Sequence, residues 1–502
     1  MKTRFAGFLS SFLMLFIICF TSPYAIAQDK YKPTWESLDS RPVPEWFSDA
    51  RFGIFIHWGV YSVPSWAPKG QYAEWYWAQT RNDKPEGPWR TFQNRVYGKD
   101  YPYELFAPHF TAELFNPQEW AELFKKAGAK YVVLTSKHHD GFCLWPAPSS
   151  KNWNSVEVGA KRDLLGDLSS AVRNVGIRMG YYYSLSNWYD KDYAPADPKG
   201  PRNIEKYVQE VMLPQMKDLV TKYKPSIIFT DGEWVASAKE FHSQEFLTWL
   251  FNDSQAPKDI VTNDRWGADT RSKHGGYYTT EYGKVDVNGT QLSNERPWEE
   301  CRGIGASFGY NRNEALNDYL TRQQIVHLLI DVVSRGGNLL LNVGPTADGR
   351  IPAIMQDRLL ALGNWLKING EAIYNSKKWL IDGEGPTPNE KSIAQATSAS
   401  EAINYTNKDI RYTQSKDGKT LFAISLGLPQ NQVLLKSVNV ISKNDGHIEL
   451  LGYNGKISYK INNQGQLIIN IPLLIANELQ CENACTFKLT GFDIALSSTL
   501  KK

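Results

Sequence analysis

Short apolar runs alternate with longer amphipathic segments along the first three quarters of the chain. Each apolar run ends in polar groups or glycine, which is typical of strands buried on both faces. The expected strands cover residues 51–58, 131–140, 178–185, 226–231, 260–266, 298–301 and 338–343. The run that ends Thr230-Asp231-Gly232 is central, because it places a carboxylate where a buried strand stops.

The segments between these strands carry the spacing and end signals of helices. Asn116, Pro117 and Glu119 form a helix start, apolar residues then recur on one face, and Gly128 ends the helix. Further helices are expected over residues 163–176, 203–224, 240–251, 322–334 and 354–369.

Strands that alternate with helices predict the α/β class and a (β/α)8-like TIM-type barrel. We expect this barrel to be irregular, because one strand or helix of the full set is not evident. A doubly wound open sheet is the alternative, and the lack of a glycine-rich dinucleotide loop after the first expected strand counts against it.

The pattern changes at about residue 382. Helical periodicity gives way to short β-prone runs separated by Asn, Gly and Lys turns, as over residues 420–426, 432–440 and 467–475. This texture predicts a smaller C-terminal β-sandwich domain. The expected division is therefore a barrel over residues 28–380 and a sandwich over residues 381–502.

The N-terminus has the pattern of a secretory signal peptide. Lys2 and Arg4 precede an apolar stretch from about residue 5 to residue 20, and Ala25-Ile26-Ala27 supplies a small-x-small cleavage site. We therefore expect residues 1–27 to be removed and the protein to be periplasmic or secreted. No second apolar run of spanning length follows, so no membrane span is expected.

Charge and cysteine content narrow the classes of partner. The formal net charge is +3, and loss of Lys2 and Arg4 leaves +1, which gives no electrostatic case for binding nucleic acid. Cys481 and Cys485 are close enough in sequence to form a disulfide in an oxidising compartment. The sequence makes no prediction of oligomeric state.

Polar side chains gather at the carboxyl ends of the expected strands. The set comprises His57, His138, His139, Tyr182, Asp231, Arg265 and Glu299. Histidine and aspartate are good metal ligands. However, His138 and His139 are adjacent and would point to opposite faces of a continuing strand, so a metal centre is the weaker interpretation.

A polyhydroxylated ligand is the stronger interpretation of the same residues. A neutral imidazole offers one donor and one acceptor to a sugar hydroxyl, and the chain is rich in Trp, Tyr and Phe, which fit sugar rings but also fill cores. Cleavage of a glycosidic bond needs two carboxyl groups. Asp231 with Glu299 or Glu300 meets that need, and Glu74 and Glu233 are competitors for the acid.

Nine short motifs in order together resemble the α-L-fucosidases of glycoside hydrolase family 29. They are HWG at 57–59, AEWY at 73–76, TSKHHDG at 135–141, NWNS at 152–155, RDL at 162–164, TDGEW at 230–234, NDRWG at 263–267, Trp298-Glu299 with Cys301, and NVGPTAD at 342–348. The resemblance implies a barrel with a C-terminal β-sandwich, a retaining mechanism without metal or other cofactor, and a fucosylated oligosaccharide or glycoconjugate as substrate.

The resemblance also assigns roles to residues. It implies Asp231 as nucleophile and Glu299 as acid/base. The fucose contacts that it implies fall on His57, Glu74, Trp75, His138, His139, Tyr182 and Arg265. We expect Phe55 and Phe308 to form an apolar wall for the methyl group of fucose; Phe308 stands where relatives often have Trp.

Three other functions remain open at this stage. The chain could be a fucose- or glycan-binding protein that has lost catalysis, or a retaining hydrolase for a related sugar. It could also be a metal-dependent hydrolase that uses His57, His138 and His139.

Overall fold

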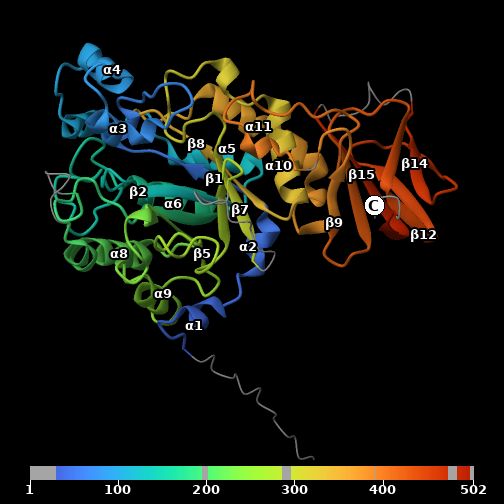
Figure 1. Ribbon diagram of the computed structural model, residues 1–502, viewed down its shortest axis with the longest axis horizontal. Coiled ribbons are helices and arrows are strands. Elements are labelled where there is room, and N and C mark those ends of the chain that lie inside the picture. Colours follow the sequence, from blue (N-terminus) through green and yellow to red (C-terminus); the bar gives the residue numbers. More distant parts are fainter. Residues whose placement is uncertain (1–29, 195–201, 285–295, 389, 473–482, 498–502) are drawn as a thin grey trace, which may run out of the picture.

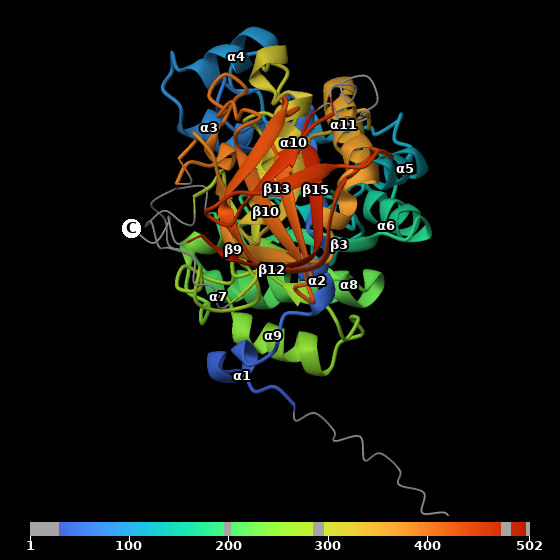
Figure 2. The same cartoon turned by 90° about the vertical axis from the view of Figure 1, so that its right-hand side faces the viewer.

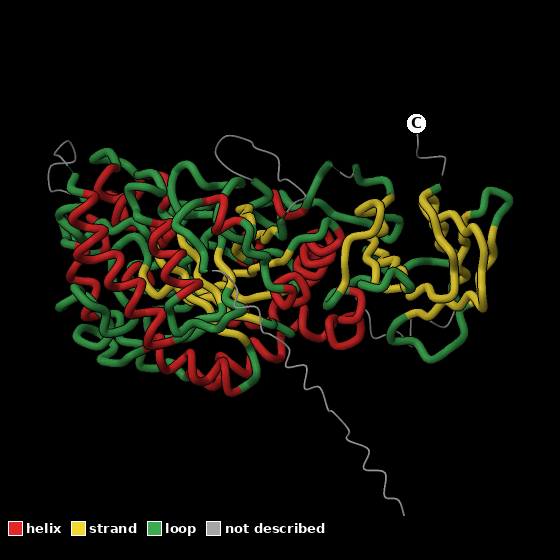
Figure 3. The backbone as a smooth tube through the Cα atoms, turned by 90° about the horizontal axis from the view of Figure 1, so that it is seen from below, coloured by secondary structure: helices red, strands yellow, loops and turns green. Residues whose placement is uncertain are grey.

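A computed structural model describes residues 30–194, 202–284, 296–388, 390–472 and 483–497. The expected signal peptide and Cys481 lie outside the described residues. The chain forms two domains side by side along the longest axis, a larger α/β domain and a smaller β domain (Figure 1). Seen from below, helices surround the strands of the larger domain, whereas the smaller domain consists almost entirely of strands and loops (Figure 3).

Eight parallel strands form the sheet of the larger domain, in the order β5-β4-β3-β2-β1-β8-β7-β6. They are β1 (Phe52–Ile56), β2 (Tyr131–Lys137), β3 (Arg178–Ser184), β4 (Ile227–Asp231), β5 (Val261–Thr262), β6 (Tyr278–Glu281), β7 (Trp298–Gly303) and β8 (Asn338–Val343). All seven expected strands are present. β6 is the additional strand, and it completes the set of eight.

The sheet curls into a barrel-like wall whose two edge strands are β5 and β6. Backbone hydrogen bonds of 3.0 Å, from Gly276 N to Asn263 O and from Tyr277 N to Thr262 O, link the segment before β6 to the end of β5. The (β/α)8-like prediction is therefore confirmed, with a seam between the first and last strands of the sheet.

The larger domain carries its helices around this sheet. They are α1 (Trp35–Asp39), α2 (Glu45–Ala50), α3 (Tyr76–Asn82), α4 (Pro88–Val96), α5 (Pro117–Ala127), α6 (Leu164–Asn174), α7 (Ile204–Tyr207), α8 (Leu213–Tyr223), α9 (Ser243–Asn252), α10 (Arg322–Ser334) and α11 (Ala353–Asn369). The sequence signals at α5 are confirmed: Asn116 Oδ1 accepts from the Gln118 and Glu119 amides, and Gly128 ends the helix at φ +88°.

The interior of the barrel is filled by side chains that alternate along each strand, as period-two geometry requires. On β4 the inward positions are Ile227, Phe229 and Asp231, and on β7 they are Glu299 and Cys301. Gly53 on β1 is required by this packing, because a Cβ there would meet the Tyr131 ring at 2.2 Å. Successive inward positions thus form layers, and the layer at the carboxyl ends faces the opening.

Seven antiparallel strands make the C-terminal domain, in the order β13-β14-β12-β15-β11-β10-β9. They are β9 (Ser376–Glu384), β10 (Ile410–Ser415), β11 (Thr420–Ser425), β12 (Gln432–Leu450), β13 (Ser458–Ile461), β14 (Gln466–Asn470) and β15 (Cys485–Leu496). The long strand β12 is interrupted by bulges and pairs with both β14 and β15, so the sheet folds over a core of its own. A β domain follows the barrel, as predicted.

A buried ion pair joins the two domains. Arg411 of β10 donates from Nε to Asp331 of α10 at 2.8 Å, and both side chains are fully buried. Ser392 Oγ donates to the second oxygen of Asp331 at 2.6 Å. Turned by 90°, the β domain lies in front of α10 and α11 (Figure 2). Among the described residues, no helix is long and apolar enough to cross a membrane.

Candidate active site

A pocket of about 400 Å³ opens at the carboxyl ends of the barrel strands. Nearly all of the site residues predicted from the sequence line it: Phe55, His57, Glu74, Trp75, His138, His139, Tyr182, Asp231, Arg265 and Phe308. Glu299 is the exception. The volume of this pocket falls within the range of small-molecule sites. Barrel enzymes assemble their catalytic groups at the carboxyl ends of the strands, where this pocket lies.

Asp231 is the last residue of β4 and accepts two strong hydrogen bonds. Arg265 donates from Nη1 to Oδ1 at 2.7 Å, and the Tyr182 hydroxyl donates to Oδ2 at 2.8 Å. Burial works to raise the pKa of Asp231, but the charge of Arg265 and the hydrogen bonds from Tyr182 and Arg265 outweigh it, so the pKa lies below its usual range. Asp231 is therefore an ionised carboxylate.

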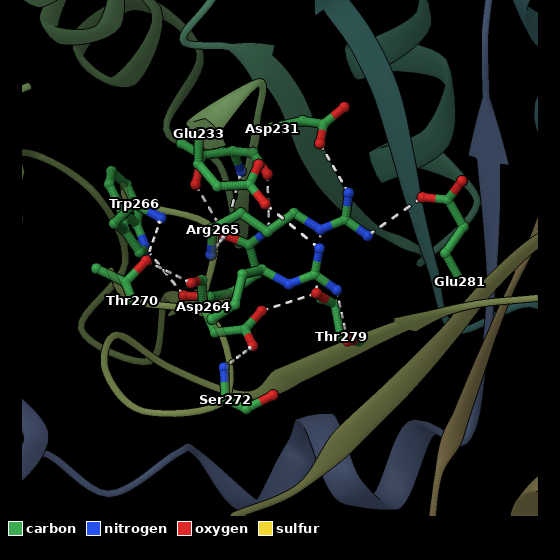
Figure 4. Close-up of polar contacts among 12 residues, drawn as sticks. Asp231, Glu233, Asp264, Arg265, Trp266, Thr270, Ser272, Thr279 and Glu281 are labelled. Atoms are coloured by element: carbon green, nitrogen blue, oxygen red, sulfur yellow. Dashed lines mark hydrogen bonds and ion pairs between the residues drawn. The ribbon is translucent and has the colours of Figure 1, made fainter. Parts of the chain in front are cut away.

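Arg265 is held by the segment that leads through β6. Its Nε donates to Thr279 Oγ1 at 3.0 Å, and Thr279 Oγ1 donates in turn to Asp264 at 2.7 Å. Its Nη2 lies 3.5 Å from Oε2 of Glu281. Figure 4 shows Asp231 and Glu281 on either side of one guanidinium. A planar guanidinium with several fixed donors is suited to holding two carboxylates in a set relation.

The tautomer of His57 follows from its neighbour. Asn342 donates from Nδ2 to the carbonyl of Phe308 at 2.6 Å, so its Oδ1 is the atom that faces His57 Nδ1 at 2.7 Å. An amide oxygen only accepts, hence Nδ1 of His57 carries the proton. Burial lowers the pKa of His57 to about 3, so the ring is neutral and Nε2 is an acceptor.

His139 is also neutral with its proton on Nδ1, and here the partner that fixes the tautomer is Ser184. The Ser184 hydroxyl donates its one hydrogen to the carbonyl of Ser186 at 2.9 Å, so it must accept from His139 Nδ1 at 2.6 Å. Burial lowers the pKa of His139 to about 4. Its Nε2, 3.6 Å from Oδ2 of Asp231, is then a free acceptor for a hydroxyl beside the carboxylate.

His138 lies between these two rings, with centroids 5.5 Å from His57 and 4.2 Å from His139. Its Nδ1 is buried and has no hydrogen-bond partner among the described residues. Burial lowers its pKa well below the usual value. Over the described ranges, no three His, Cys, Asp or Glu side chains are grouped as metal ligands would be.

An aromatic wall closes one side of the pocket. Phe55 lies 6.3 Å from Phe308 and 5.0 Å from Phe229, measured between ring centroids, and all three rings line the cavity. Phe229 was not among the predicted site residues, although its place two positions before Asp231 puts it on the same inward face. The wall is apolar, as expected for a surface that meets a methyl group.

Glu299 does not lie in this site, which corrects the position expected for the acid/base. It is the second residue of β7, aligned with Thr279 on β6 and with Asn338 at the start of β8. Tyr131, the first residue of β2, donates to its Oε2, and the side chain is fully buried. Cys301, two residues further along β7, lines the pocket instead. Glu299 thus sits one inward layer below the pocket floor.

Glu300, the alternative to Glu299, is also outside the pocket. It accepts hydrogen bonds from the Thr280 hydroxyl and from the Gly283 amide, and it is buried. Its side chain holds the turn after β6.

Besides Asp231, three glutamates line the pocket. Glu281, at the end of β6, accepts from the Tyr72 hydroxyl at 2.8 Å, and its side chain is 32% exposed. Glu233 accepts from Arg271 at 3.3 Å, and Glu74 accepts from the Gly309 amide at 2.7 Å; both are buried. Burial raises the pKa of Glu233 and raises that of Glu74 to about 8. Glu281 is a pocket carboxyl group that sequence reasoning missed.

An ionised carboxylate, a second carboxyl group and a ring of hydroxyl acceptors at the mouth of a (β/α)8-like barrel define a glycoside hydrolase. Comparisons with known proteins agree. The family model described as alpha-L-fucosidase matches residues 18–371, and the model of the alpha-L-fucosidase C-terminal domain matches residues 404–490. The chain belongs to the α-L-fucosidase family, and its activity is that of an α-L-fucosidase.

Individual relatives cover nearly the whole chain. Tissue alpha-L-fucosidase of Homo sapiens is 41% identical over 494 residues, which cover 98% of each chain. Alpha-L-fucosidase of Dictyostelium discoideum is 38% identical and covers 89% of this chain and 93% of its own. The crystal structure of Thermotoga maritima alpha-fucosidase in complex with fucose superposes with a TM-score of 0.73 at 37% identity, covering 91% of this chain and all of that one.

Proposed function

We propose that the enzyme releases terminal α-L-fucose with retention of configuration, with Asp231 as nucleophile and Glu281 as acid/base. The observation that carries this proposal is the shared contact of both carboxylates with Arg265, at 2.7 Å and 3.5 Å, on the wall of one pocket. Retention requires two carboxyl groups on either side of the scissile bond.

Asp231 suits the nucleophile because it is ionised and fixed. Its low pKa keeps it deprotonated at working pH, and Tyr182 and Arg265 orient both oxygens. These hydrogen bonds orient the carboxylate and leave it nucleophilic, because the ester oxygens formed after attack on C1 can still accept from either donor.

Glu281 suits the acid because of where the leaving group must go. Fucose fills the enclosed part of the pocket, so the remainder of the glycan has to leave through the mouth. Glu281 is partly exposed there, whereas Glu233 and Glu74 are buried and already engaged by Arg271 and by the Gly309 amide. Proximity to the leaving oxygen is the first requirement of a general acid.

The reaction then runs in two balanced steps. An oxygen of Asp231 attacks C1, the glycosidic C1–O bond breaks, and the leaving oxygen takes the bonding pair together with the proton of Glu281. In the second step, Glu281 removes a proton from water, the water oxygen attacks C1, and the ester bond to Asp231 breaks. Both carboxyl groups return to their starting states, and fucose leaves as the α anomer.

The neutral histidines supply recognition in this scheme. His57 and His139 each present an unprotonated Nε2, so they accept hydrogen bonds from fucose hydroxyls. The rings of Phe55, Phe229 and Phe308 meet the methyl group. That the Thermotoga maritima relative binds fucose supports the same assignment here.

We further propose that the enzyme is exported and acts on fucosylated oligosaccharides or glycoconjugates. Lys2, Arg4 and the Ala25-Ile26-Ala27 sequence after an apolar stretch support export. Expression in a bacterial host with a secretory pathway, followed by N-terminal sequencing, should give a mature chain that begins at Gln28.

The stereochemical outcome tests the mechanism. Proton NMR of fresh hydrolysate should show α-fucose before mutarotation; β-fucose as first product would overturn retention. With azide added, Asp231→Gly should form β-fucosyl azide from an activated fucoside, whereas Glu281→Gly should form the α azide through an intact Asp231. The same anomer from both variants would refute the division of roles.

A further inference from the structure

One large aromatic ring stands exposed at the rim of the active-site pocket. Among the exposed large apolar side chains of the described residues, only Trp234, at 49% exposure, and Tyr189, at 44%, are aromatic. Trp234 lines the pocket and Tyr189 does not. The mechanism above gives Trp234 no role.

The backbone fixes Trp234 relative to the nucleophile. Asp231 ends β4, Gly232 turns the chain at φ +76°, and Trp234 lies in the 3₁₀ turn Glu233–Val235. A Cβ at Gly232 would meet Ser186 Oγ at 2.6 Å, so the turn is tight and leaves little freedom. The indole is therefore placed three residues from Asp231 by a defined path.

Other aromatic side chains hold the indole from beneath. The Trp75 ring stacks against Trp234 with centroids 5.9 Å apart and planes at 23°, and the His139 ring meets it edge-on at 5.4 Å. Trp75 is itself braced by Trp188, at 5.2 Å. Packing covers part of the indole, while nearly half of the residue stays open to solvent, so the open surface is rigid.

We infer that Trp234 forms a binding site for the aglycone, in which the pyranose ring that carries the fucose stacks on the exposed indole. This inference rests on the proposed function. The apolar C–H face of a pyranose matches a flat aromatic face, and a rigid aromatic ring provides contact area at low entropic cost. The ligand class is therefore a sugar joined directly to fucose, not a small or flexible non-sugar group.

Position also separates this site from the fucose pocket. Asp231 is 13% exposed and His57, His139 and Glu74 are almost fully buried, so the groups that contact fucose lie deeper than Trp234. Glu281, which protonates the leaving oxygen, is also partly exposed on the pocket wall, at 32%. The bond to be broken thus lies between the enclosed subsite and the rim, and the next ring lies at the rim.

The test compares two substrates that share fucose and differ in the aglycone. An α-L-fucosyl disaccharide with galactose as leaving sugar has a ring to stack, whereas α-L-fucosyl fluoride has none. We expect Trp234→Ala to lower the ratio of kcat/KM for the disaccharide to kcat/KM for the fluoride by about tenfold or more, and Trp234→Phe to recover most of it. Tyr189→Ala, which removes an equally exposed ring outside the pocket, should change this ratio by less than about twofold.

Each outcome is decisive. A ratio in Trp234→Ala within about twofold of the wild-type ratio, or an equal loss on both substrates, would overturn the aglycone site, because a stacking contact acts only where a ring is present. An equal fall in Tyr189→Ala would overturn the assignment to Trp234. If the wild-type enzyme hydrolysed neither substrate, the proposed function itself would fail, which is a separate result.

Discussion

The variant Glu299→Gln tests which residue is the acid/base. The sequence resemblance implies Glu299, whereas the structure favours Glu281. Glu299 lies below the pocket floor, and burial raises its pKa to about 8. It is therefore protonated near pH 7, and an amide of the same shape replaces a neutral acid. We expect kcat/KM for fucosyl disaccharides to stay within about threefold of wild type, since no group in contact with substrate changes.

The same variant makes a prediction about stability. In the unfolded chain Glu299 loses its proton above about pH 4.3, whereas in the folded protein it keeps the proton to about pH 8. The folded state therefore binds more protons in this window, and this residue lowers wild-type stability as pH rises, by about 1.4 kcal/mol per pH unit. Gln has no such dependence, so the stability of Glu299→Gln relative to wild type should grow by about 3 kcal/mol between pH 5 and pH 7.

Urea unfolding of both proteins at pH 5 and pH 7 measures this difference, and the initial rate on a fucosyl disaccharide measures function. Glu281→Gln is the matched comparison, because it is the same chemical change at the pocket wall. Loss of the proton donor there should lower kcat/KM by about 10²–10⁴-fold, and by less for an activated leaving group. A loss of this size in Glu299→Gln, with Glu281→Gln nearly active, would refute the placement of the acid on β6.

Three further predictions address the nucleophile, the apolar wall and the domain contact. Arg265→Met removes the charge that opposes the effect of burial on Asp231, so the acidic limb of the kcat/KM pH profile should move up by about one pH unit or more; an unmoved limb would contradict the assigned cause. Phe308→Ala should lower the preference for an aryl α-L-fucoside over the matching α-L-galactoside by about tenfold, measured as a kcat/KM ratio, and an unchanged ratio would remove Phe308 from the methyl wall. Arg411→Met leaves Asp331 without its buried partner across the domains and should cost about 3–5 kcal/mol in thermal or urea unfolding, with activity retained at low temperature.

Much of the barrel could be predicted because its strands are buried on both faces. Continuous apolar runs such as 227–229 mark such strands without help from tertiary structure. β6 gave no such mark, since Tyr278–Glu281 is four residues long and contains two threonines and a glutamate. The β-prone Tyr-Tyr-Thr-Thr run after Gly275 and Gly276 was the available signal, and it carries the missed residue Glu281.

The error at Glu299 has a related cause. Residues 298–301 were recognised as a strand, but the sequence did not reveal that it continues to Gly303. Without that extension, Glu299 was assigned to the carboxyl end, whereas it is the second of six residues. By contrast, His57 and His139 were placed at the carboxyl ends correctly, because the strands before them are apolar and are followed at once by polar groups.

The seam between β5 and β6 has a consequence for how such an enzyme can change over time. Across it, Asp264, Arg265 and Thr279 are joined by side-chain hydrogen bonds, and Arg265 reaches on to Glu281. The spacing of the two carboxylates proposed to react, Asp231 and Glu281, is thus influenced by a few replaceable side chains. Single substitutions at this edge can therefore adjust catalytic geometry while the rest of the barrel keeps its architecture, which gives evolution a local means of tuning leaving-group preference.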